Sequence, residues 1–199
     1  MNRTVKRVLI ASSLIVVVVA GVYLYWMMTL ASAFGAFDRT YTQADLVQHY
    51  EAHAPALWAL NTYLNARVPA HHAVEIEFEG DRTIRIFHVE ANGLYSSNWD
   101  VPADSPKADS LLHALGWTRQ TLATLHQKLA QIGCISIASG EPGTIGYQRS
   151  GMGKYSFKLF AYPPTDSVKR QYSGSCTDIF YKPRVVLEYG GGAIGPQCF

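Results

Sequence analysis

The chain has 199 residues, which suits one ordinary domain with an appendage and is too short for two sizeable cores. Its formal net charge of +2 comes from 17 basic and 15 acidic residues, but Arg3, Lys6 and Arg7 precede every acidic one. From Asp38 onward the balance is slightly negative, which argues against a nucleic-acid binder. A hydrophobic content of 48% argues against disorder.

The first predicted element is a membrane-spanning helix. No charged residue occurs from Val8 to Phe37, and about 20 apolar helical residues suffice to cross a bilayer core. We expect residues 8–30 to contact the membrane and the stretch to residue 37 to be juxtamembrane. Because basic residues precede this segment, the positive-inside rule places residues 1–7 in the cytoplasm and residues 38–199 outside it.

A cleaved signal peptide is the alternative interpretation of this segment, with Ala31-Ser32-Ala33 as its cleavage site. We favour an uncleaved anchor, because signal sequences have apolar regions of about 7–15 residues and this one is longer. Tyr23, Tyr25 and Trp26 also fall at the depth of the far interface, where aromatic residues are enriched. Both interpretations place residues 38–199 outside the cytoplasm.

Two helical stretches are predicted next. Thr42 followed by Asp45 is typical of a capped helix N-terminus. Pro55 is expected to interrupt or restart this helix, because proline is tolerated in a first turn but not in a helix interior. The second stretch carries a helical stripe that ends before Pro69: Leu57, Leu60 and Leu64.

A β-hairpin follows, with alternating apolar and polar residues in Val74–Glu79 and Ile84–Val89. A two-residue turn would place Glu77 opposite Ile84, whereas a three-residue loop, Gly80 to Arg82, places Phe78 there. We choose the longer loop because it matches both faces of the hairpin. Its further pairs are Ile76 with Ile86 and Glu77 with Arg85.

The remaining chain is predicted to form a polar loop from Asn92 to Pro106, two helices and several strands. One helix ends at Gly116, and the other begins after Thr118 and ends at Gly133. The predicted strands are Cys134–Ser139, Thr144–Arg149, Tyr155–Tyr162, Thr177–Tyr181 and Val185–Tyr189. This order predicts an α+β fold: one antiparallel β-sheet with helices packed on one face, preceded by the N-terminal transmembrane helix.

The chain has three cysteines, Cys134, Cys176 and Cys198, which an oxidising compartment would allow to form one disulfide. We prefer the pair Cys176–Cys198, because it would hold a glycine-rich C-terminal tail in place. The alternative, three reduced and partly buried thiols, stays open at this point. No Cys-x-x-Cys pair occurs, so neither a structural zinc site nor a dithiol redox motif is indicated.

The histidines do not form a convincing metal site. His49 and His53 are four residues apart, but a zinc-protease helix needs Glu directly after the first His, and Glu51 is two residues after it. His88 falls in the apolar phase of its strand, which predicts a satisfied, partly buried side chain. We therefore predict no metal and no cofactor.

A cysteine-dependent transpeptidase or hydrolase is the enzymatic alternative, with Cys176 as nucleophile and Arg184 nearby. An N-terminal anchor followed by His, Cys and Arg in that chain order is similar to sortase transpeptidases. In that family the Cys ends an apolar, Thr-rich strand, whereas residues 172–175 are typical of a loop. The likeness is confined to the chain order, and a non-catalytic protein is the better interpretation.

The C-terminal third combines basic and aromatic residues of the kinds that are enriched at protein interfaces. The predicted function is a membrane-anchored extracytoplasmic domain that serves as an interaction or structural module of the cell envelope, with an envelope protein as partner. A small-ligand binding domain is the alternative. The candidate binding residues are Arg149, Lys154, Tyr155 and Lys158.

Overall fold

The computed structural model describes residues 3–151, 153–190 and 198–199. The chain divides into two units, Met1–Arg39 and Thr40–Phe199. The first contains α1 (Arg3–Ala33), in which Ser13–Ser32 is long and apolar enough to cross a membrane and has no buried part. A signal sequence near the N-terminus can also meet this criterion of length and apolarity, so α1 by itself is compatible with both interpretations of the segment.

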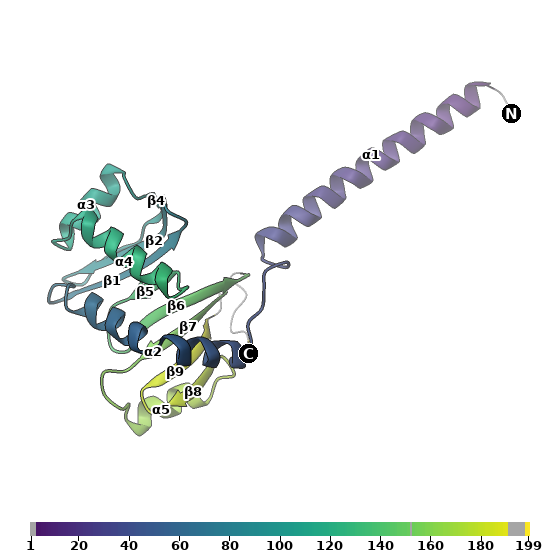
Figure 1. Ribbon diagram of the computed structural model, residues 1–199. Coiled ribbons are helices and arrows are strands. Elements are labelled where there is room, and N and C mark those ends of the chain that lie inside the picture. The colour runs from purple at the N-terminus through teal and green to yellow at the C-terminus, as the bar shows by residue number, and fades with distance from the viewer. Residues whose placement is uncertain (1–2, 152, 191–197) are drawn as a thin grey trace. The chain divides into compact units, whose positions relative to one another are not determined.

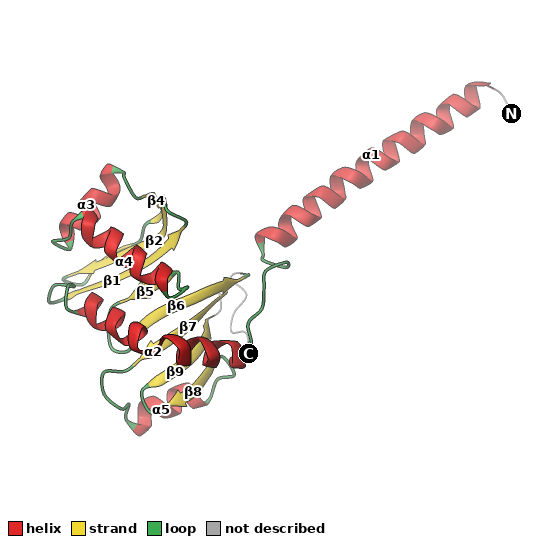
Figure 2. Cartoon of the chain, viewed as in Figure 1, coloured by secondary structure: helices red, strands yellow, loops and turns green. Residues whose placement is uncertain are grey.

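The second unit is an α+β domain built on one antiparallel sheet, as predicted (Figures 1 and 2). In the described residues the sheet has nine strands in the order β3-β2-β1-β5-β6-β7-β9-β8, and β4 also pairs with β2. The strands are β1 (His72–Glu79), β2 (Thr83–Ala91), β3 (Leu94–Ser96), β4 (Trp99–Pro102), β5 (Ser136–Ala138), β6 (Gly143–Ser150), β7 (Gly153–Leu159), β8 (Asp178–Lys182) and β9 (Val185–Gly190). The helices are α2 (Gln43–Asn65), α3 (Pro106–Ala114), α4 (Arg119–Gln131) and α5 (Asp166–Ser173).

The five strands predicted in the C-terminal half correspond to β5–β9, with ends shifted by up to three residues. The predicted polar loop between Asn92 and Pro106 is wrong in part, because it contains β3 and β4. Both are short and pair with β2 rather than with each other. Three or four residues are too few to display a clear alternation, so pairing with β2 decides their conformation.

Helices α2, α3 and α4 cover one face of the sheet, and the core lies between these two layers (Figure 1). Helix α5 departs from the predicted arrangement of helices on one face. The Tyr172 ring of α5 lies 4.8 Å from the Nζ atom of Lys158, whose neighbour on β7, Phe157, contacts Tyr50 of α2 on the opposite face. The same ring contacts Phe160 and Phe180, so α5 packs on the other face, beside β8.

Helix α2 runs unbroken through Pro55, so the predicted interruption is wrong. Its N-terminus does form the predicted capping box between Thr42 and Asp45. Proline removes one backbone hydrogen bond from a helix interior. Both halves of α2 nevertheless bury apolar side chains in the same core, and this packing stabilises one continuous helix. These buried residues are Leu46, Tyr50, Leu57, Leu60 and Leu64.

The hairpin of β1 and β2 has the predicted loop and the predicted pair of Phe78 with Ile84. Beyond that pair a β-bulge shifts the register, so that Glu77 lies opposite Ile86 and Glu75 opposite His88. The predicted pairs Ile76–Ile86 and Glu77–Arg85 are therefore wrong. One extra residue in a strand turns every later side chain of that strand to the other face of the sheet. Phe87 therefore points into the core, and His88 lies on the opposite face.

Candidate functional site

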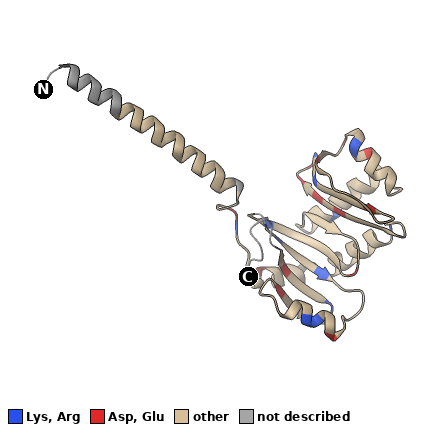
Figure 3. Cartoon of the chain, turned by 180° about the vertical axis from the view of Figure 1, so that it is seen from behind, with Lys and Arg blue, Asp and Glu red and all other residues tan. Residues whose placement is uncertain are grey.

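The sheet surface that faces away from α2–α4 carries most of the charged residues of the strands, and we call it the polar face. Figure 3, drawn from behind, shows acidic and basic positions on neighbouring strands of this surface. Antiparallel pairing brings them together, because directly paired residues share a face. The polar face includes Glu75, Glu77, His88, Arg149, Lys154, Lys158 and Glu188.

Glu77 is the centre of the first charged cluster and is only 1% exposed. The Nε atom of Arg149 donates to one of its carboxylate oxygens. Nζ of Lys154 donates to the other oxygen at 3.0 Å and to Glu75 at 3.3 Å. We call these four residues the Glu77 cluster.

Two small residues between the strands let this cluster form. Arg149 lies on β6 and reaches Glu77 across β5, whereas Lys154 lies on β7 and reaches it across β6 and β5. On the way lie Ser136 and Gly146, and a Cβ atom at Gly146 would stand 2.0 Å from Ser136 Oγ and 2.9 Å from Lys154 Cδ. A side chain at position 146 would therefore collide with Ser136 and displace the lysine from its path.

The electrostatics of the cluster keep Glu77 ionised. Burial alone would raise its pKa, but the hydrogen bond from Arg149 and the charges of Lys154 and Arg149 hold the pKa below the ordinary value. An ionised carboxylate with two cations is a hydrogen-bond acceptor and cannot act as a general acid at neutral pH. The cluster is thus suited to holding strands together or to contacting a charged partner.

A second charged cluster lies nearer the β8 edge. Nζ of Lys158 is 2.7 Å from Glu188 Oε1 and 3.8 Å from Asp178 Oδ1. Burial would lower the pKa of Lys158, but the hydrogen bond and charge of Glu188 raise it above the ordinary value. The pKa of Asp178 is raised, chiefly by burial. Lys158 is thus the shared cation of two carboxylates, Glu188 and Asp178.

His88 occupies the other end of the polar face and is 9% exposed. Its Nδ1 atom is 2.7 Å from the Tyr95 hydroxyl and 3.5 Å from Glu75 Oε2. Its Nε2 atom is 2.9 Å from Ser97 Oγ. Both ring nitrogens have partners, as expected for a satisfied histidine, although its position on the polar face differs from the expected apolar one.

A hollow of about 200 Å³ opens beside His88. Two carboxylates, Glu75 and Glu90, stand around it together with the Tyr95 side chain. Its other lining residues are small or apolar: Ala73, Val74, Ala138 and Ser139. It is a concave space with converging polar groups, a combination typical of ligand sites.

The structure does not bring the four predicted binding residues into one surface. Arg149, Lys154 and Lys158 lie on the polar face, each paired with a carboxylate. Tyr155 points the other way, is 2% exposed and stacks on Tyr189 with ring centroids 4.1 Å apart. Strand alternation separates position 155 from its even-numbered neighbours, so the predicted basic and aromatic patch is instead a neutralised charged surface.

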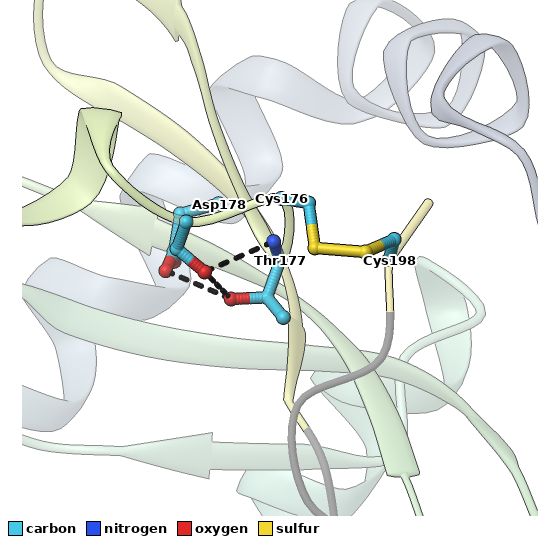
Figure 4. Close-up of a disulfide and its surroundings, with 5 residues drawn as sticks. Cys176, Thr177, Asp178 and Cys198 are labelled. Atoms are coloured by element: carbon cyan, nitrogen blue, oxygen red, sulfur yellow. Dashed lines mark hydrogen bonds between the residues drawn. A yellow bond between two sulfur atoms is a disulfide. The ribbon is translucent and has the colours of Figure 1, made fainter.

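The cysteines form the pair that the sequence analysis preferred. A disulfide joins Cys176 to Cys198 across 22 residues, next to Thr177 and Asp178 (Figure 4). Cys134 is a free thiol, and burial raises its pKa to about 12. It stays a protonated thiol at neutral pH, which is the unreactive form.

The histidine pair of α2 is partly buried and carries no metal-binding arrangement. The rings of His49 and His53 lie 4.7 Å apart, and His49 also stacks on Phe157. Burial, and then the charge of His53, lower the pKa of His49 to about 4. Within residues 3–151, 153–190 and 198–199, no group of three or more His, Cys, Asp or Glu could hold a metal ion.

Sequence reasoning missed both the burial of Glu77 and the grouping of Glu75, His88 and Tyr95. The alternating glutamates of β1 predicted a solvent-exposed face of the sheet. The sequence near β1 does not indicate that Arg149 of β6 and Lys154 of β7 cover Glu77. The grouping around His88 depends on the bulge and on β3. The two-residue Asn92-Gly93 turn directly after a predicted strand was the available signal for a hairpin there.

Comparison with known proteins adds no family and no related fold to this description. No protein-family model matches the chain, and neither a curated protein nor a solved structure does.

Proposed function

We propose that this protein is a single-pass membrane protein that displays its α+β domain outside the cytoplasm as a non-catalytic interaction module of the cell envelope. The observation that carries the proposal is α1, whose stretch Ser13–Ser32 is apolar and unburied. Arg3, Lys6 and Arg7 precede it, whereas Asp38 and Arg39 cancel after it. This asymmetry favours a cytoplasmic N-terminus.

The disulfide supports an extracytoplasmic location for the domain. Disulfides persist in oxidising compartments and are rare where thiols are kept reduced. Cys176 and Cys198 are both exposed, so a reducing cytoplasm would have access to the bond between them.

The state of the cysteines also favours binding over thiol catalysis. The sulfur of Cys176 is bonded to that of Cys198, and Cys134 is buried with a raised pKa. Neither is an activated nucleophile, which a transpeptidase or hydrolase of this kind requires. The polar face, with its mixed charges and its hollow, is the surface that we assign to the partner.

Membrane orientation can be tested with C-terminal reporter fusions of the full chain in a bacterial host. We expect an alkaline phosphatase fusion to be active, because this enzyme becomes active only after export from the cytoplasm. A green fluorescent protein fusion should be dark, because the exported protein does not become fluorescent. Changing Arg3, Lys6 and Arg7 to Glu should lower the phosphatase signal several-fold. The matched control, Lys169→Glu with Arg170→Glu in exposed α5, should not.

A bright fluorescent fusion with an inactive phosphatase fusion would contradict the orientation. The anchor has its own readout, the intact mass of the membrane-extracted protein. A chain that keeps its N-terminal segment upholds an anchor, whereas a chain that begins at Phe34 shows cleavage.

The binding role can be tested by photocrosslinking in native membranes. Benzoylphenylalanine at Thr144, which lies on the polar face opposite Lys158, is expected to give a discrete crosslinked species. The same group at Gln127, an exposed position on α4, is the matched control and should give none. Identical patterns from both positions would count against the polar face as the interaction surface.

A further inference from the structure

The hollow beside His88 exists because two alanines stand where neighbouring positions carry long side chains. Ala138 pairs with Glu75, and Ala73 pairs with Glu90. The carboxylates and the Tyr95 side chain therefore rise around a floor that includes two methyl groups. Its volume of about 200 Å³ fits an ammonium or guanidinium group with part of its alkyl chain.

The charge around the hollow is unbalanced. Glu75, Glu77 and Glu90 contribute three carboxylates, and Arg149 and Lys154 contribute two permanent cations. Both cations contact Glu77, and Lys154 also reaches Glu75. The side chain of Glu90 makes no ion pair or hydrogen bond with any residue that the structure describes. The surplus negative charge thus lies at the hollow, on the side away from the cations.

The aromatic wall is held in place by His88. The Tyr95 hydroxyl is 2.7 Å from His88 Nδ1, and Ser97 holds the other ring nitrogen at 2.9 Å. Tyr95 is 63% exposed, so a ligand can reach its ring. A tyrosine ring attracts cations through its negative face, and carboxylates beside it add to the attraction.

From this geometry we propose that the hollow formed by Glu75, Glu90, Tyr95 and Ala138 binds an organic cation, an alkylammonium or a guanidinium group. The inference rests on the proposed function of the domain as a binding module and names the chemistry that the polar face recognises. An anion would meet two carboxylates, and a neutral ligand would leave the surplus charge unpaired. The same chemistry is carried by free amines and by the Lys or Arg side chains of a partner.

The direct test is an NMR titration of the full chain in detergent micelles, following the ring resonances of His88 and Tyr95. The probes are n-butylammonium and n-butylguanidinium, with 1-butanol as the uncharged control. We expect saturable shifts with either cation, at dissociation constants on the order of millimolar, and none with butanol. Absence of saturable shifts with both cations would overturn the proposal.

Four variants assign the binding to the hollow. Glu90→Gln is expected to weaken binding about three- to fivefold and Tyr95→Leu about two- to fivefold. Ala138→Leu fills the floor without changing the charge, so binding should fall by roughly tenfold or more. Glu79→Gln is the matched control for Glu90→Gln, since Glu79 lies on the neighbouring strand β1 and pairs with Arg85, and it should bind as the unmodified chain does.

Equal weakening by Glu90→Gln and Glu79→Gln would mean general charge attraction and would overturn the site. N-acetyllysine methylamide and N-acetylarginine methylamide distinguish the two sources of the cation. If these amides bind as tightly as n-butylammonium and n-butylguanidinium, the natural ligand is a side chain of a partner protein. If only the two butyl cations bind, the natural ligand is a soluble amine or guanidine. Either outcome supports the site. The reporter and crosslinking results do not depend on this titration, so failure of the cation site and failure of the proposed function are separable.

Discussion

Replacing both Arg149 and Lys154 with methionine is expected to lower the free energy of unfolding by about 3–5 kcal/mol. The double variant leaves the carboxylate of Glu77, which is 1% exposed, without its two cations. An uncompensated buried charge is strongly destabilising, because neither water nor a partner solvates it. Urea unfolding of the full chain in detergent, followed by near-UV circular dichroism, measures the effect.

The matched control is Arg85→Met, which breaks an ion pair with Glu79 whose side chains are 41% and 53% exposed. Exposed pairs contribute about 0–1 kcal/mol, so this variant should unfold nearly as the unmodified chain does. Adding Glu77→Met to the double variant should recover much of the lost stability, since it removes the orphaned charge. A double variant within 1 kcal/mol of the control would refute the buried-charge account.

The same cluster makes stability depend on pH. The folded-state pKa of Glu77 lies below its ordinary value of 4.5, so the unfolded chain takes up its proton first as the pH falls. The stabilisation is present above about pH 4.5 and is lost as the pH falls through the folded pKa. The unmodified chain should therefore lose more stability below that pH than the triple variant, which lacks this carboxylate.

Reduction of the disulfide between Cys176 and Cys198 is expected to cost about 3 kcal/mol, because a closed loop of this size restricts the unfolded chain. The thermal midpoint of the full chain, measured with and without dithiothreitol, reports the change. In the double variant Cys176→Ser with Cys198→Ser, the reductant should have no effect. Cys134 is a buried thiol in either condition.

Equal midpoints of the unmodified chain with and without reductant would contradict this prediction. Alkylation followed by mass spectrometry verifies the redox state in each sample. Cys134 should be alkylated only after unfolding, because its burial both shields the thiol and raises its pKa to about 12.

Local sequence patterns were sufficient for features that depend on neighbouring residues. The capping box of Thr42 and Asp45, the loop from Gly80 to Arg82 and the strands β5–β9 are each encoded within a few residues. The α+β class followed from the order of these elements. The apolar segment of α1 could also be recognised from the sequence, because its length and composition can be counted directly.

Long-range packing decided the rest. Pro55 lies inside a continuous helix because both halves of α2 bury apolar residues on one sheet. Helix α5 buries none of its residues, so it has no apolar stripe by which to be found. The bulge between Glu77 and Phe78 allows the burial of Phe87, and it carries His88 to the polar face.

The apolar N-terminal helix, the class of the domain and most of its strands can thus be predicted from local patterns, because these features depend on periodicity and composition within one segment. The burial of Glu77 and the hollow lined by Glu75, Glu90 and Tyr95 follow instead from the packing of the folded domain. The burial of Glu77 joins β1 to the distant strands β6 and β7. The grouping around the hollow depends on a register that one inserted residue reverses. The sequence around each glutamate does not indicate that Glu77 forms ion pairs with residues of other strands, whereas the side chain of Glu90 has no partner among the described residues.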